Sequence, residues 1–232
     1  MLHINSISEY DTEPFKIVCI GSSTVGKSSI VERYCLDEFD DKHGTTIGAS
    51  MFNRKIIAYD DKGDMRMIKA NIWETGGQER FFSIVPMYLR NADAIIFVFD
   101  ASNYGFSLNQ LIHTWLPLVQ RRAISPLVYF TVVNKIDLLS DTQLEDLQKN
   151  INRRKLPREL SNIFYTSAKE NYGIDMLFKS ITEALISEEF LEKKRNYHST
   201  LGKENNADVI YLLPEEKSRK KGCCLLRRFS KK

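Results

Sequence analysis

One segment near the N-terminus has the residue types and the spacing of a phosphate-binding loop. Residues 21–28, GSSTVGKS, match the pattern G-x-x-x-x-G-K-[ST], in which glycines allow several backbone N–H groups to converge on one anion. The segment follows an apolar run, Phe15–Ile20, and opens a helical segment whose N-terminus adds the positive end of its dipole. A chance glycine loop is the alternative, and the strand-then-helix context counts against it. We therefore predict a nucleotide site whose phosphate-binding residues are Gly21, Ser22, Ser23, Thr24, Val25, Gly26, Lys27, Ser28 and Ser29.

A second segment, Asn134-Lys135-Ile136-Asp137, supplies a carboxylate that can select the base. A carboxylate accepts hydrogen bonds from both N1–H and the exocyclic amine of guanine, and adenine presents no such pair of donors. Asn134 would tie this loop to the phosphate loop, and the Lys135 stem would cover the base plane. An ordinary surface loop is the alternative, but the position directly after an apolar strand favours a guanine site. The next such strand is followed by residues 166–169, TSAK, where the Ala168 N–H can donate to the guanine O6.

Two further segments have groups suited to chemistry at the γ-phosphate. In residues 73–81, WETGGQERF, Glu74 can hold Mg²⁺ through water, the Gly77 N–H can contact the γ-phosphate, and Gln78 can orient the attacking water. Thr46 can close over Mg²⁺ and the same phosphate, so losing that phosphate would release two loops. The predicted catalytic residues are Gln78 and Lys27, the phosphate contacts extend to Thr46 and Gly77, and the predicted cofactor is Mg²⁺ with ligands Ser28, Thr46 and, through water, Glu74.

The elements that must position these residues alternate between strand-like and helix-like patterns. Strands are predicted at Phe15–Ile20, Met51–Tyr59, Met65–Trp73, Ala92–Asp100, Leu127–Val133 and Asn162–Thr166. Helices are predicted at Lys27–Leu36, Glu79–Arg90, Leu108–Arg122, Asp141–Ile151 and Ile174–Lys194. This alternation predicts an α/β fold, with a mostly parallel six-stranded sheet, one antiparallel strand and helices on both faces. Ligands of such sheets bind beyond the carboxyl ends of the strands, where all the motifs above fall.

Composition narrows the class of protein. The 232 residues are 43% hydrophobic and 27% charged, which is ordinary for a soluble globular protein. No apolar run reaches the roughly 18 residues that a membrane-spanning helix needs, and the N-terminus lacks the apolar region of a signal peptide. The net charge of +3 includes residues 217–232, which contain eight Lys and Arg and no acidic residue. Because the basic residues are not spread over a folded face, no nucleic-acid partner is expected.

Periodicity fades from about residue 196. We predict a short N-terminal extension at 1–14, a folded domain at 15–195, and a flexible linker with a basic membrane-targeting tail at 196–232. Cys223 and Cys224 lie in this tail and are candidates for lipidation. A basic patch plus an acyl chain would meet the two-signal requirement for stable anchoring. A solvated basic tail or a nuclear-type address is the alternative.

Over about residues 14–195, the sequence resembles the Ras superfamily and, within it, the Rab branch. The segments that carry the resemblance are GSSTVGKSS, TTIGASM, WETGGQERF, PMYLRNADA, VNKIDL and YTSAK. The resemblance implies a P-loop GTPase fold, or G-domain, and a GTP/GDP-cycling switch that regulates vesicle and endomembrane traffic, with TIGA and VPMY leaning toward the endosomal type. It also implies an effector surface at Met51, Trp73 and Tyr88, and it adds Phe39 at the guanine edge to give the set Phe39, Asn134, Lys135, Asp137, Ser167, Ala168 and Lys169.

Partners and location also follow from the resemblance. An exchange factor, a GTPase-activating protein and effectors are expected, with the chain a cytoplasmic monomer bound peripherally to the cytosolic face of endomembranes through its tail. No arginine of this chain is evident that could stabilise the negative charge on the phosphates in the transition state. Intrinsic hydrolysis should therefore be slow unless a partner supplies such an arginine.

Three features depart from the Rab pattern. The acid after Trp73 is Glu74 where the family has Asp, and Gly76 stands where Rab proteins usually have Ala. Eight residues, LLRRFSKK, follow Cys224, which does not match the family's terminal prenylation signals. Glu74 and Gly76 leave a second hypothesis open, a GTP-bound scaffold with little or no hydrolysis. A metabolic kinase on the same phosphate loop is a third, but Gln78 and Asn134–Asp137 would have no role in it.

Overall fold

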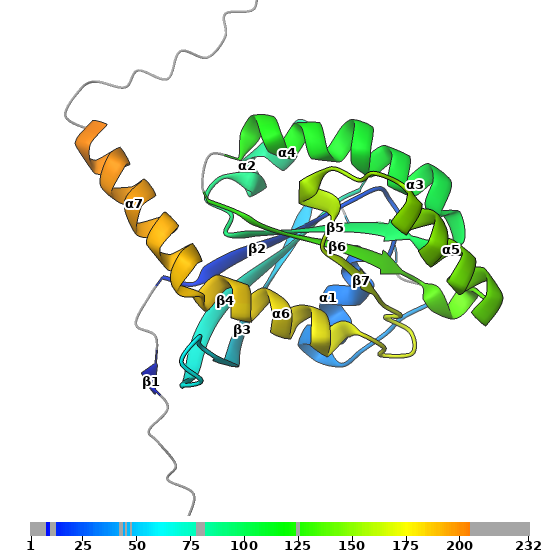
Figure 1. Cartoon of the computed structure of the whole chain (residues 1–232), viewed down its shortest axis with the longest axis horizontal. Coiled ribbons are helices and arrows are strands. Elements are labelled where there is room, and N and C mark those ends of the chain that lie inside the picture. Colours follow the sequence, from blue (N-terminus) through cyan, green and yellow to red (C-terminus); the bar gives the residue numbers. More distant parts are fainter. Residues whose placement is uncertain are drawn as a thin grey trace, which may run out of the picture. The chain divides into compact units, whose positions relative to one another are not determined.

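The computed structural model describes residues 8–9, 13–41, 44, 46, 48–77, 82–123 and 126–204. Its centre is a sheet in which five parallel strands run in the order β4-β2-β5-β6-β7, with β3 antiparallel to β4 at one edge (Figure 1). These strands are β2 (Phe15–Ile20), β3 (Ala49–Tyr59), β4 (Met65–Thr75), β5 (Ala94–Asp100), β6 (Val128–Asn134) and β7 (Ile163–Tyr165). The predicted fold class, a mostly parallel six-stranded sheet with one antiparallel strand, is confirmed.

A short additional strand comes from the segment predicted as an N-terminal extension. β1 (Ser8–Glu9) pairs in parallel with β4 at Arg66 and Met67. It continues along the same edge of β4 that β2 occupies from Ala70 onward. The prediction missed this strand because two residues are too few to show any periodicity.

The two faces of the sheet are covered by different helices, as predicted. Side chains that alternate along β2 and β5 point into two separate cores, which is the period-2 pattern of a strand buried on both faces. In Figure 1, α1 (Lys27–Leu36) and α6 (Ile174–Ile186) lie below the sheet. The opposite face carries α2 (Val85–Leu89), α3 (Tyr104–Gln110), α4 (Leu116–Arg122) and α5 (Asp141–Arg153).

Two predicted helices on that second face differ from those observed. The helix predicted at Glu79–Arg90 is shorter, because residues 82–84 form a turn before α2 and residues 79–81 lie outside the described part. The helix predicted at Leu108–Arg122 begins earlier, at Tyr104, and contains a π-helical segment, Leu111–Trp115, between α3 and α4. Pro117 explains this segment, since its ring would clash with the carbonyl of residue 113 and it has no N–H to donate.

The helix predicted as a single element at Ile174–Lys194 is instead broken at Ser187. This residue has extended backbone angles (φ −60°, ψ 142°), and α7 (Glu188–Glu204) starts immediately after it. Ser187 Oγ donates to the Ala184 carbonyl at 2.8 Å and accepts from Phe190 N–H at 3.3 Å, so one serine ends α6 and caps α7. α7 also continues through residues 196–204, which periodicity assigned to the linker.

By its internal contacts the chain divides into two units, residues 1–197 and 198–232, and the site lies in the first. Within the described residues, no helix combines the length and the apolar character needed to cross a membrane. The basic part of the predicted tail, including Cys223 and Cys224, lies outside the described residues.

Candidate functional site

The phosphate loop runs from the end of β2 into the first turn of α1. Gly26 is in the left-handed region (φ 91°) at the N-cap of α1, and a Cβ there would lie 2.3 Å from Asn134 Nδ2. Only glycine fits both restrictions. The conformation leaves the N-terminus of α1 open toward a ligand, with its dipole favouring an anion.

Lys27 is the buried cation of this loop. Its side chain folds back so that Nζ donates to the Ser22 carbonyl at 2.8 Å. Burial lowers the pKa of Lys27 to about 8, and the negative groups nearby, Glu74 first, only partly offset this effect. Gly77 approaches from the end of β4, since a Cβ there would meet Lys27 Nζ and the Ser22 carbonyl at 2.5 Å. The ammonium is therefore enclosed between two loops, where a phosphate would favour its charged form.

Oxygen atoms suited to a hard cation converge next to Lys27. Ser28 Oγ and Thr46 Oγ1 share a hydrogen bond of 2.9 Å, although Ser28 lies in the first turn of α1 and Thr46 in the loop before β3. Glu74 is buried, and its Oε2 has no hydrogen-bond partner among the described residues. Two hydroxyls and an unpaired carboxylate oxygen fit Mg²⁺, which prefers oxygen ligands and keeps several waters. Among the described residues, no three or more His, Cys, Asp or Glu side chains form a cluster that could hold a metal ion.

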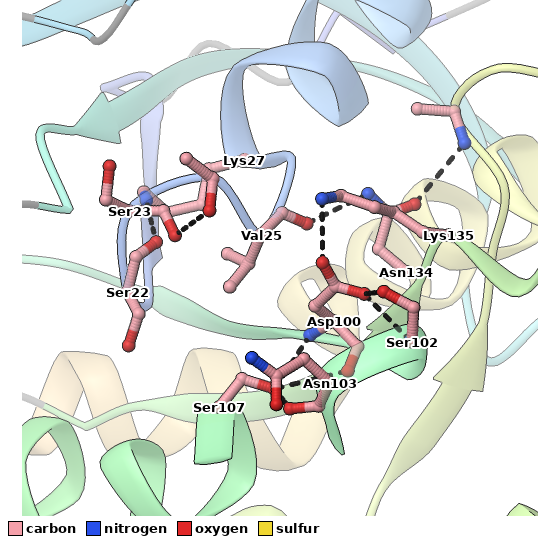
Figure 2. A network of polar contacts seen from close by, with 12 residues as sticks. Ser22, Ser23, Val25, Lys27, Asp100, Ser102, Asn103, Ser107, Asn134 and Lys135 are labelled. Atoms are coloured by element: carbon pink, nitrogen blue, oxygen red, sulfur yellow. Dashed lines mark hydrogen bonds and ion pairs between the residues drawn. The ribbon is translucent and has the colours of Figure 1, made fainter. Parts of the chain in front are cut away.

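The second loop is joined to the phosphate loop by Asn134. Its Nδ2 donates to the Val25 carbonyl at 3.1 Å (Figure 2). Its Oδ1 accepts from Thr166 Oγ1 at 3.1 Å and from Ala168 N–H at 3.3 Å. Asn134 is 1% exposed, so this buried amide fixes three segments with respect to one another. The Ala168 N–H, predicted to donate to guanine O6, is used here by Asn134 and would have to be shared with a base.

The two charged residues of this loop are each held by a partner. Ser167 Oγ donates to Asp137 Oδ1, which orients the carboxylate. Lys135 Nζ forms an ion pair of 2.7 Å with Asp100 Oδ2 at the end of β5. Lys135 has left-handed backbone angles (φ 66°, ψ 36°), which turn its side chain back over the end of the sheet.

A pocket of about 400 Å³ lies where these loops meet, a volume suited to a nucleotide. It is lined by the predicted residues Ser23, Thr24, Gly26, Lys27, Ser28, Ser29, Phe39, Thr46, Gly77, Asn134, Lys135, Asp137, Ala168 and Lys169. Five further predicted residues are not among those that line it: Gly21, Ser22, Val25, Glu74 and Ser167. Gln78 lies outside the described residues, so its predicted catalytic role stays a prediction.

The chain was compared with known proteins. Residues 16–137 match the family described as Ras of Complex, Roc, domain of DAPkinase. GTP-binding protein YPT53 of Saccharomyces cerevisiae is 33% identical over 92% of this chain and 95% of its own length. Ras-related protein Rab-21 of Rattus norvegicus is 31% identical over 90% of this chain and 91% of its own length. Ras-related protein Rab-21 of Bos taurus is 31% identical over 92% of this chain and 93% of its own length.

The chain belongs to the Rab family of small GTPases. The predicted identity, a Rab-like GTPase that hydrolyses GTP and acts in vesicle traffic, is confirmed at the level of the family. Small GTPases of this family use Mg²⁺ with GTP and bind GTP, GDP and regulators. The comparisons do not favour the alternative of a scaffold without hydrolysis.

The predicted effector residues of this Rab-family chain lie together on β3, β4 and α2. Met51 is the cross-strand partner of Trp73 and is 44% exposed. The rings of Trp73 and Tyr88 lie 5.5 Å apart, and Lys16 Nζ lies over the Trp73 ring at 5.2 Å. Trp73 thus lies close to both an aromatic ring and a cation, and Met51 is the exposed member of the group.

Several residues that shape the pocket were missed from the sequence. Asp40, Asp41, Gly44 and Leu138 also line it, and Asp100 holds Lys135 from behind. The first three lie between Phe39 and Thr46 and could have been expected from that position alone. Asp100 had no signal beyond its place at the carboxyl end of a buried strand.

Proposed function

We propose that this Rab-family chain switches by binding GTP and GDP in the pocket at the carboxyl ends of its strands. The observation that supports this best is that residues from five segments, distant in sequence, line one pocket. They come from the phosphate loop and the start of α1, from the loop that carries Phe39 and Thr46, from Gly77, from the loop that carries Asn134 and Asp137, and from Ala168 and Lys169. Lys27 and the N-terminus of α1 lie at the phosphate loop, and Asp137 comes from another loop of the same pocket. These groups match a ligand that carries phosphates and a base with two adjacent donors.

We assign the guanine base to Asp137, Lys135, Ala168, Lys169 and the Phe39 ring. The Asp137 carboxylate, oriented by Ser167, would accept the two guanine donors, and a base without them would leave it unpaired in the pocket. Asn134, which also lines the pocket, belongs to the same base site and would hold its loop against the phosphate loop through its bonds to Val25, Thr166 and Ala168.

The phosphates would lie against the phosphate loop and Lys27. We propose that Ser28 and Thr46 hold Mg²⁺ directly and Glu74 through water, as their converging oxygens suggest. Mg²⁺ bound with the nucleotide neutralises charge that develops on the phosphates. Gly77, in contact with Lys27 and Ser22, would detect whether the γ-phosphate is present, and Gln78 would orient the attacking water.

The remaining assignments concern the surroundings of the domain. We propose that Met51, Trp73 and Tyr88 contact effectors, and that exchange and GTPase-activating factors act on the loops around Thr46 and Gly77. The basic residues of 217–232, with S-acylation of Cys223 or Cys224, would place a monomeric chain on the cytosolic face of an endomembrane.

The test of the base assignment is Asp137→Asn in the full chain. An amide offers an oxygen that accepts from N1–H and an NH₂ group that donates to the 2-oxo group of xanthine, whereas the same NH₂ group opposes the 2-amino group of guanine. We expect GDP affinity to fall by on the order of 10²-fold or more and xanthosine diphosphate affinity to rise, measured by competition against a fluorescent nucleotide. A variant that binds both as the parent does would refute the assignment.

The test of the cation assignment is Glu74→Asp and Glu74→Gln, with GDP release followed as Mg²⁺ is titrated. Glu74→Gln removes the charge and should shift the Mg²⁺ midpoint to higher concentration. Glu74→Asp keeps the charge and shortens the reach, so it reports whether the longer side chain weakens the site. Identical midpoints in all three chains would show that Glu74 does not act on the cation.

A further inference from the structure

The ammonium of Lys135 is held by a residue that does not line the pocket. Asp100 Oδ2 lies 2.7 Å from Lys135 Nζ, and the two side chains are 12% and 30% exposed (Figure 2). Lys135 lines the pocket and Asp100 does not. Asp100 therefore contacts a residue of the pocket wall without being part of that wall itself.

The position of Asp100 is fixed independently of Lys135. Its Oδ1 accepts from Ser102 N–H at 2.8 Å and from Ser102 Oγ at 2.6 Å, and its backbone N–H donates to Ser107 Oγ at 3.1 Å. The parallel pairing of β5 with β6 sets Asp100 beside Asn134, the residue before Lys135. The carboxylate is thus an anchor built into the sheet and the turn that follows it.

The anchor determines where the lysine stem runs. A Cβ on Gly26 would lie 3.9 Å from Lys135 Cε, so the stem passes beside the phosphate loop on its way to Asp100. A free lysine side chain has several rotatable bonds, and ordering it on binding costs conformational entropy. The ion pair orders it before any ligand arrives.

We propose that Asp100 is a positioning residue for guanine-nucleotide binding, which holds the Lys135 stem as a preformed wall of the base site. The inference rests on the proposed guanine site and adds to it a residue from another strand. It predicts that Asp100 acts on nucleotide retention only through Lys135 and leaves hydrolysis of bound GTP unchanged.

The experiment is a double-mutant cycle in the full chain with Asp100→Asn and Lys135→Met. Asn keeps the acceptor for Ser102 and is an equally good cap, so the turn is preserved while the ion pair is lost. Met keeps an unbranched apolar stem without the charge. Release of fluorescent GDP is measured at fixed Mg²⁺ and salt, and hydrolysis is measured in a single turnover of preloaded GTP.

We expect Asp100→Asn to speed GDP release by on the order of tenfold in the parent and to have little further effect beside Lys135→Met. The single-turnover rate should stay at the parent value in Asp100→Asn. Asp60→Asn is the matched control, because Asp60 also accepts backbone N–H groups and pairs with Arg66, with side chains 13% and 26% exposed. It should leave GDP release unchanged.

Three results would overturn the inference. Equal acceleration in both backgrounds would show that Asp100 acts on the fold, and no acceleration in the parent would show that Lys135 needs no anchor. A hydrolysis rate that falls as much as release rises would place the effect at the phosphates. Failure of the proposed site is distinguishable: a parent chain that retains no guanine nucleotide refutes both, whereas tight GDP binding that Asp100→Asn leaves unchanged refutes this inference alone.

Discussion

Gly77→Ala tests whether the end of β4 detects the γ-phosphate by lying against the phosphate loop. The added Cβ would lie 2.5 Å from Lys27 Nζ and 2.5 Å from the carbonyl carbon and oxygen of Ser22. Carbon contacts are optimal at about 3.5–4.0 Å, so the two loops must separate by about 1 Å. The Ser22 backbone cannot give way easily, because its carbonyl accepts from Lys27 Nζ. We therefore expect the segment that carries Gly77 to move outward.

A displacement of about 1 Å in a positioning group costs on the order of 10²-fold in rate. We expect single-turnover GTP hydrolysis to slow by that factor in Gly77→Ala, while GDP release stays at the parent rate because GDP has no γ-phosphate. Gly105→Ala is the control: a Cβ at this position in α3 meets nothing within 4 Å, so hydrolysis should be unchanged. Hydrolysis by Gly77→Ala at the parent rate would refute the reasoning.

Contacts elsewhere in the chain lead to three more expected outcomes. Ser187→Ala removes the cap of α7 and should lower the free energy of unfolding by about 1 kcal/mol, measured by urea unfolding followed by circular dichroism; an unchanged midpoint would contradict the cap. Lys194→Met leaves the buried Asp93 without its 2.7 Å partner and should cost about 2 kcal/mol in the same assay, whereas exposed Lys193→Met should cost far less. Burial raises the pKa of the Cys35 thiol to about 11 from 9.0, so the folded chain keeps a proton that the unfolded chain loses. This contribution to stability is therefore lost as pH rises from about 9 to 11, and iodoacetamide labelling of Cys35, mapped by mass spectrometry, should rise over that range instead of levelling off near 9.

Much of the fold could be predicted from the sequence because its strands are buried on both faces. The run at residues 94–99 is apolar throughout and fully buried, and such a run has few alternatives to a central parallel strand. The start of α1 at Lys27 was also predicted correctly, since the glycine before it marks the boundary. Motifs that follow a strand at the same edge of the sheet converge in space, which is why most of the pocket lining could be named.

The errors arise where a single side chain overrides periodicity. Ser187 lies within a continuous amphipathic pattern, but its side chain ends the helix through two hydrogen bonds to the backbone. Neither hydrophobic periodicity nor helix propensity predicts such bonds. Pro117 falls inside the helix predicted at Leu108–Arg122, where its effect is a local π-helical segment and not a break. The role of Asp100 depends on strand register, which places it beside Asn134 only after the order β5-β6 is known.

The two ends of the pocket differ in how complete they are without a ligand. At the base end the polar groups are already paired: Asn134 satisfies both ends of its amide, and Asp137 and Lys135 each have a partner. At the phosphate end Lys27 has a lowered pKa, and Glu74 has a buried oxygen with no partner among the described residues. Burying such groups is costly unless opposite charge arrives, so phosphate and cation must offset a cost that the fold itself carries. In the proposed site, the groups that would select the base are therefore already ordered in the folded chain, whereas the loops that carry Thr46 and Gly77 would depend on the phosphates. That division is what a switch requires, because the number of phosphates can change while the same base stays bound.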